Sequence, residues 1–130
     1  MQTQPTQVHT GVPGLDGILG GGLPRNRLYL IDGEPGTGKT TLALQFLAEG
    51  VRNNERGLYV TLSETRDELT DVARSHSWSL DGIEVQELMP HPEPTGETYT
   101  LFHPAEVELQ QTVDAVFRAV EASGPTRVVL

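Results

Sequence analysis

Short apolar runs alternate with amphipathic stretches along this chain. Continuous apolar runs at residues 28–31 and 58–62 predict two buried strands. Residues 83–88 alternate apolar and polar positions, which is typical of a strand, and residues 127–130 form another buried apolar run. Because helical patterns separate these strands, the order predicts an α/β fold with a mainly parallel sheet, right-handed crossovers and flanking helices.

The intervening stretches predict three helices. The first begins after Lys39 and carries leucines at helical spacing. The second begins at Thr65, because a threonine followed three residues later by Glu68 is a capping-box signature. The third opens at Pro104, a favoured first helical residue, and ends at the Ser-Gly-Pro of residues 123–125.

The remaining segments are predicted as a tail and loops. Residues 1–9 are polar and without periodicity, so we expect a flexible N-terminal tail before a domain over residues 10–130. Residues 89–98 contain three prolines and a glycine and predict a loop. The glycines are concentrated before residue 39, which indicates turns or loops that approach a ligand closely.

One of these glycine-rich loops fits the pattern G-x-x-x-x-G-K-[ST], with the strand before it and the helix after it that the motif requires. Its backbone N–H groups and the N-terminus of the following helix would bind phosphate. Lys39 would reach the β- and γ-phosphates, and the Thr40 hydroxyl would ligate Mg²⁺. The predicted phosphate-binding residues are Gly33, Glu34, Pro35, Gly36, Thr37, Gly38, Lys39, Thr40 and the adjoining Thr41.

An alternative explanation is that the glycine-rich turn only joins a strand to a helix, with Lys39 solvated. The register of strand, turn and helix favours nucleotide binding instead. Lys39 is also the only lysine of the chain.

Glu64 is the second candidate for chemistry. It follows the strand at residues 58–62, and ligands of parallel sheets bind outside the carboxyl ends of the strands. A carboxylate there could position a water molecule for attack on the γ-phosphate, which would make Glu64 catalytic together with Lys39. Alternatively, Glu64 is only an acidic residue at a helix N-terminus, where the helix dipole favours it.

Composition narrows the classes of function. The 130 residues suffice for one domain, and the net charge of −9 argues against nucleic-acid binding by the chain alone. All of that charge lies after Tyr59. The absence of cysteine excludes disulfides and thiolate sites. With no signal pattern and no apolar run long enough to cross a membrane, a cytoplasmic protein without membrane contact is expected.

Three segments together resemble the RecA-superfamily ATPases, most closely the KaiC-like branch that includes KaiC and RadA-type proteins: TGVPGLDGILGGGLP, GEPGTGKTTLALQFL and LYVTLSETRDEL. The resemblance implies a RecA-like P-loop fold, ATP with Mg²⁺ as ligands, and homo-oligomeric rings or filaments. Nucleic acid would be bound only through such an assembly.

The chain departs from the family pattern at three places, of which the mildest is Asn26, where the family tends to have glycine. Glu64 matches the second of two adjacent glutamates, and Ser63 stands in the place of the first. The family's Walker B aspartate would follow Leu130. We therefore interpret residues 10–130 as the N-terminal portion of a RecA-like domain, truncated before that aspartate.

These observations predict the ATP-binding domain of a KaiC/RadA-like ATPase. In the intact oligomer, Mg²⁺-dependent hydrolysis would drive signalling, regulation or recombination-type assembly. The 130-residue chain alone is expected to bind nucleotide weakly or not at all and not to sustain hydrolysis. One alternative is a P-loop phosphotransferase, such as a KaiC-type autokinase. Another is a non-enzymatic module whose oligomerisation is switched by nucleotide.

Overall fold

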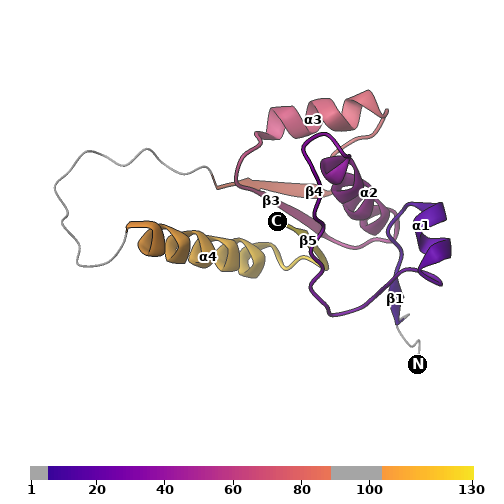
Figure 1. The fold of residues 1–130 in the computed structure, drawn as a ribbon, viewed down its shortest axis with the longest axis horizontal. Coiled ribbons are helices and arrows are strands. Elements are labelled where there is room, and N and C mark those ends of the chain that lie inside the picture. Colours follow the sequence, from indigo (N-terminus) through magenta and orange to yellow (C-terminus); the bar gives the residue numbers. More distant parts are fainter. Residues whose placement is uncertain (1–5, 89–103) are drawn as a thin grey trace.

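The centre of the fold is a three-stranded parallel sheet. A computed structural model describes residues 6–88 and 104–130, and its sheet has the strand order β4-β3-β5 (Figure 1). The strands are β3 (Gly57–Thr61), β4 (Ile83–Glu87) and β5 (Arg127–Val129). All five residues of β3 are buried because this strand lies between the other two, which explains its continuous apolar run.

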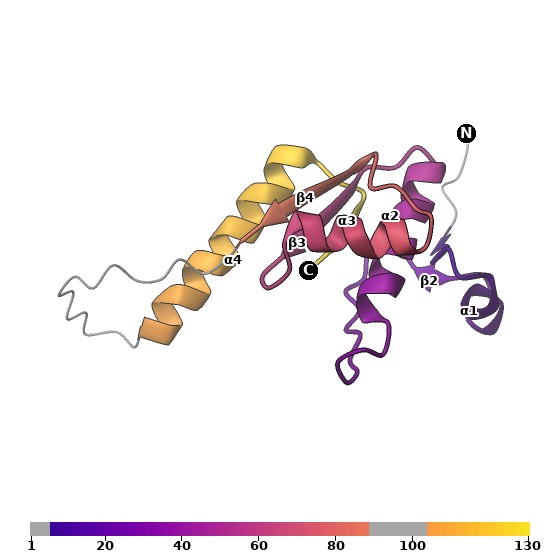
Figure 2. The same ribbon diagram turned by 90° about the horizontal axis from the view of Figure 1, so that it is seen from above.

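Helices cover both faces of this sheet. Helix α3 (Arg66–Ser75) connects β3 to β4, and α4 (Pro104–Ser123) is followed by β5 on the other side of β3. Because the two crossovers run in opposite directions along the sheet, right-handed connections place α3 and α4 on opposite faces. Figure 2 shows this arrangement, with α2 (Lys39–Arg52) on the same side as α3.

The apolar core fills the space between the sheet and the pair α2 and α3. Its buried members are Leu44, Leu47, Tyr59, Leu69, Ala73 and Ile83. Trp78, which follows α3, packs against this core. The helical spacing of apolar residues in the sequence therefore identifies the faces of α2 and α3 that contact the sheet.

The N-terminal part of the described chain forms a small substructure of its own. Strand β1 (Gln7–Val8) pairs antiparallel with β2 (Leu23–Pro24), and α1 (Pro13–Ile18) lies between them in sequence. The predicted tail over residues 1–9 thus includes two residues that form a strand, while residues 1–5 lie outside the described part.

The predicted strand at residues 28–31 is the one element that the structure contradicts. These residues form no strand, and the side chains of Leu28 and Leu30 are 99% and 91% exposed. A buried parallel strand needs a hydrogen-bonded neighbour, and residues 28–31 pair with none of the described strands, although the outer edge of β5 is open. The apolar run is therefore exposed in this structure instead of buried in the sheet.

The other predicted elements are confirmed within one or two residues. Thr65 is the N-cap of α3, and its capping box with Glu68 is present. Helix α4 spans Pro104–Ser123 as expected, and the predicted loop at residues 89–98 lies outside the described residues. The structure thus has the α/β architecture expected of a RecA-like P-loop domain. None of its described helices combines the length and apolarity required to cross a membrane.

Candidate functional site

The glycine-rich loop leads directly into α2. Gly36 and Gly38 have φ angles of 83° and 99°, in the left-handed region that glycine adopts without steric cost. Gly38 is the N-cap of α2 and contributes no side chain that could cap the helix. The N–H groups at this helix end are therefore available to an anion, as the sequence motif predicts.

The side chain of Lys39 lies over the loop. Its Nζ donates hydrogen bonds to the carbonyl oxygens of Gly33 and Glu34, the latter at 3.3 Å. The Thr37 hydroxyl donates to the same Glu34 carbonyl at 2.8 Å, which closes the turn. The ammonium group thus lies beside the N–H groups that would surround a phosphate, where it would add a positive charge.

Thr40 and Glu64 meet although they are far apart in sequence. The Thr40 hydroxyl donates a hydrogen bond of 3.1 Å to Glu64 Oε1. The other carboxylate oxygen, Oε2, is buried and has no hydrogen-bond partner among the described residues. An unsatisfied buried acceptor costs about 1–3 kcal/mol, so this oxygen is ready to accept a bond from a ligand or from water.

Two residues of β3 that sequence reasoning did not single out complete this cluster. The Thr61 hydroxyl accepts from the Glu64 N–H and donates to the Glu64 carbonyl, each at 2.9 Å. Burial raises the pKa of the Tyr59 phenol and the Glu64 carboxylate raises it further, while a hydrogen bond with Thr40 lowers it in part. The period-two alternation of a strand could have identified them, because residues 59 and 61 share one face of β3.

The hydroxyl and carboxylate oxygens of this cluster are of the kind that ligate Mg²⁺. Mg²⁺ usually takes one or two protein oxygens together with substrate phosphates and water. The Thr40 hydroxyl lies next to the glycine-rich loop of residues 33–40, which is called the phosphate loop below. The unpartnered Oε2 of Glu64 is a hard acceptor beside this hydroxyl. The residues present therefore fit the ion that the motif implies.

The other residues of interest lie around this cluster or away from it. Thr41, the last of the predicted phosphate-binding residues, lies in the first turn of α2, and Ser63 is exposed. Within residues 6–88 and 104–130 there is no group of three or more His, Cys, Asp or Glu that could hold a metal ion. His76 stacks on Trp78 with ring centroids 4.6 Å apart, and His91 and His103 lie outside the described residues.

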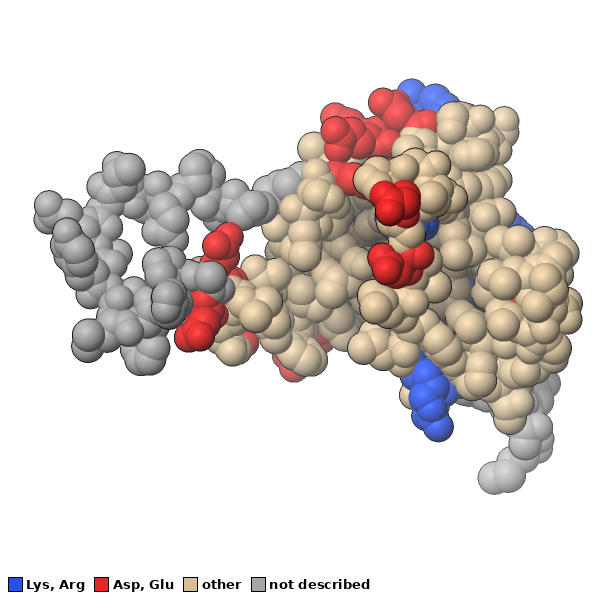
Figure 3. Space-filling view, viewed as in Figure 1, with Lys and Arg blue, Asp and Glu red and all other residues tan. Residues whose placement is uncertain are grey.

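Acidic side chains gather over α3 and along α4 on the face shown in Figure 3, where Lys and Arg are visible in only a few places. An anionic ligand gains little from such a surface. The positive charge of Lys39 and the N-terminus of α2 are therefore the local features that would attract a phosphate.

Comparison with known proteins places this site in context. The sequence profile of the KaiC ATPase family matches residues 8–130. A UPF0273 protein of Thermotoga maritima is 41% identical over 78 residues, which are 60% of this chain and 32% of that protein. The circadian clock oscillator protein KaiC of Parasynechococcus marenigrum is 37% identical over 101 residues, or 74% of this chain and 20% of that protein. The chain therefore spans a third or less of the length of these relatives.

Proposed function

The chain belongs to the KaiC family of ATPases, and on that premise we propose that residues 33–41 bind the phosphates of Mg²⁺·ATP for hydrolysis in a homo-oligomeric protein. The observation that carries the proposal is the convergence of Lys39, Thr40 and Glu64 at the N-terminus of α2. A polyphosphate there would meet backbone N–H groups, the helix dipole and an ammonium group.

Each side chain has a separate role in this proposal. Lys39 holds the β- and γ-phosphates by charge-assisted hydrogen bonds. Thr40 Oγ1 would hold Mg²⁺, and the ion, when bound, would supply positive charge beside the phosphate oxygens. Glu64 keeps Oε1 on Thr40 and offers Oε2 to a water molecule positioned for in-line attack.

We also propose a wider setting for this activity, which the family resemblance supports. ATP bound between neighbouring subunits would couple hydrolysis to a change in subunit arrangement, for signalling, regulation or recombination-type assembly. Nucleic acid would be contacted only through that assembly. A protein of this kind would act in the cytoplasm.

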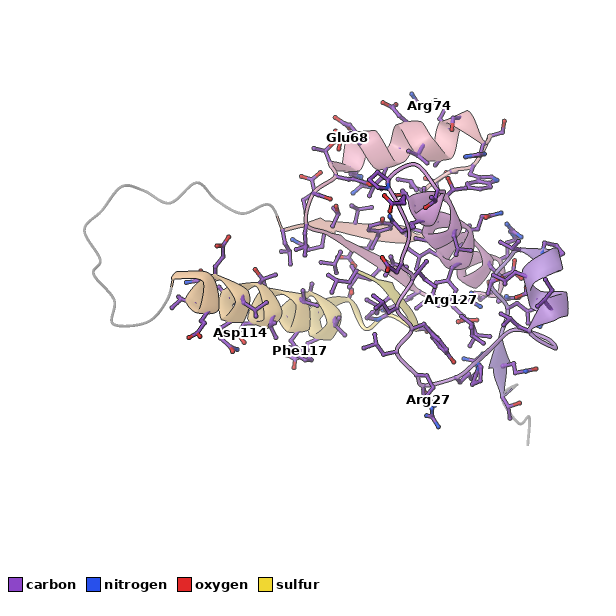
Figure 4. All side chains as sticks on the ribbon, viewed as in Figure 1. Arg27, Glu68, Arg74, Asp114, Phe117 and Arg127 are labelled. Carbon is purple, nitrogen blue, oxygen red and sulfur yellow. The ribbon has the colours of Figure 1, made fainter. Side chains whose placement is uncertain are left out.

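Nucleotide binding provides the direct test. Lys39→Ala is expected to weaken Mg²⁺·ATP binding about 10- to 100-fold, since it removes a charged hydrogen-bond donor. Titration calorimetry on the intact oligomeric protein measures this. Arg74→Ala is the matched control, because it removes a cation from the exposed end of α3 (Figure 4) and should leave the affinity unchanged. Equal binding by wild type and Lys39→Ala would refute the proposal.

A further inference from the structure

The side chain of Thr61 holds the backbone of Glu64. Thr61 is the last residue of β3 and only 4% exposed. Its hydroxyl accepts from the Glu64 N–H and donates to the Glu64 carbonyl, both at 2.9 Å. The Thr61 carbonyl itself accepts from the Leu88 N–H at 2.9 Å, so the anchor is part of the sheet.

This anchor determines which side chain after β3 faces the phosphate loop. With the chain pinned at Thr61 and Glu64, Leu62 and Ser63 form the outer part of the turn and are exposed. Glu64 returns towards α2, where Oε1 accepts the 3.1 Å bond from Thr40. A carboxylate at position 64, and not a side chain at position 63, therefore reaches the candidate metal ligand.

Precise placement matters here because the contact is sensitive to distance. A hydrogen bond of 3.1 Å is lost if its partners separate by an ångström. Supporting contacts that lock such a side chain commonly decide whether a site binds its metal ion well. The Thr61 hydroxyl makes hydrogen bonds to both the N–H and the carbonyl of Glu64, so its removal would release the Glu64 backbone.

We propose that Thr61 is a positioning residue that sets Glu64 against Thr40 and thereby supports Mg²⁺ binding at the phosphate loop. This rests on the nucleotide-binding function proposed above and adds to it a residue that acts through Glu64 alone. Thr61→Val keeps the β-branched shape and removes the hydroxyl, whereas Thr61→Ser keeps the hydroxyl.

The test measures the Mg²⁺ concentration that half-saturates binding of a fluorescent ATP analogue to the intact oligomeric protein. Thr61→Val should raise this concentration about tenfold, and Thr61→Ser should stay within about twofold of wild type. Thr70→Val is the control and should change nothing, because the Thr70 hydroxyl donates to the Arg66 carbonyl within α3, away from Glu64. Thermal unfolding of each variant verifies that the fold is retained.

A double-mutant cycle separates positioning from general destabilisation. In a Glu64→Ala background, Thr61→Val should have no further effect on the Mg²⁺ requirement. An equal effect in both backgrounds, or none in the wild-type background, would overturn the proposal.

Amide hydrogen exchange tests whether Thr61 holds Glu64 even if the proposed nucleotide binding is wrong. If wild type and Lys39→Ala bind the analogue equally, nucleotide binding is wrong, and the role of Thr61 in Mg²⁺ binding falls with it. The contact between Thr61 and Glu64 is then tested by the exchange rate of the Glu64 N–H. The Glu64 N–H should be protected in wild type and Thr61→Ser and exchange at least about tenfold faster in Thr61→Val. Equal exchange in all three would show that Thr61 does not hold Glu64.

Discussion

Asp16 illustrates how single residues organise the N-terminal segment. Its Oδ1 accepts hydrogen bonds of 2.8 Å from both the backbone N–H and the hydroxyl of Thr10, whose side chain is buried. Burial of the carboxyl raises its pKa, but the bonds from Thr10 and Gly11 and the charge of His9 outweigh this and lower the pKa overall. The ionised form of Asp16 therefore holds the turn before α1.

This lowered pKa gives a pH dependence with a definite sign. A carboxyl whose pKa is lower in the folded than in the unfolded state stabilises the fold at pH values above 3.8, the ordinary pKa of such a group. The contribution is lost as pH falls through the folded-state pKa. Asp16→Asn should therefore lower Tm by a few degrees at neutral pH, with the difference shrinking as pH falls below 3.8 and through the lowered folded-state pKa. Scanning calorimetry across this range checks it, and a gap that widens on acidification would contradict it.

Among the elements, α3 is the helix whose start the sequence defines best. The Thr65 hydroxyl accepts the Glu68 N–H at 3.2 Å, and the Glu68 carboxylate accepts the Thr65 N–H at 2.7 Å. These bonds satisfy two donors at the helix N-terminus. The same cap determines where the chain enters α3 after Glu64, so it also borders the candidate site.

Loss of this cap has a predictable cost. Thr65→Ala should reduce the free energy of unfolding by about 1 kcal/mol, because it leaves the Glu68 N–H without its partner. Urea denaturation followed by circular dichroism measures the change. Thr70→Ala, which removes a hydroxyl from the middle of the same helix, is the matched control and should cost less. Equal losses would mean that the capping box contributes nothing specific.

At the scale of the whole molecule, Arg127 joins three parts of the chain. This β5 residue is 3% exposed, and its guanidinium lies amid the central elements (Figure 4). It donates to the carbonyls of His9 and Phe46 at 2.7 and 2.8 Å and pairs with the Glu55 carboxylate at 3.2 Å. Gly50 leaves room for it, since a Cβ there would lie 2.7 Å from Arg127 Cδ.

Removal of this buried cation should strongly destabilise the fold. Arg127→Met is expected to cost about 3–5 kcal/mol in unfolding free energy, because Glu55 would keep a half-buried charge without its partner. Arg52→Met is the control, since its ion pair with Glu49 is at the surface and should contribute about 0–1 kcal/mol. Chemical denaturation of both variants compares them. Similar losses would show that the Arg127 contacts do not hold the three parts together.

The sequence by itself determined the features that depend on local pattern. The phosphate loop, the three helices and the cap at Thr65 are properties of neighbouring residues, because backbone conformation and capping act over a few positions. The apolar periodicity likewise predicted the strands β3, β4 and β5 and the faces of α2 and α3 that form the core.

Only the tertiary structure decided the features that depend on distant partners. The apolar run at residues 28–31 predicts a buried strand, but its side chains are exposed in the structure. Burial requires an adjacent strand, and the run itself does not reveal whether one is present. The contact of Thr40 with Glu64, the anchor at Thr61 and the interior position of Arg127 each join residues through folding of the chain. Residue type gives the chemistry of such groups, whereas the packing of the sheet against α2 decides which of them meet.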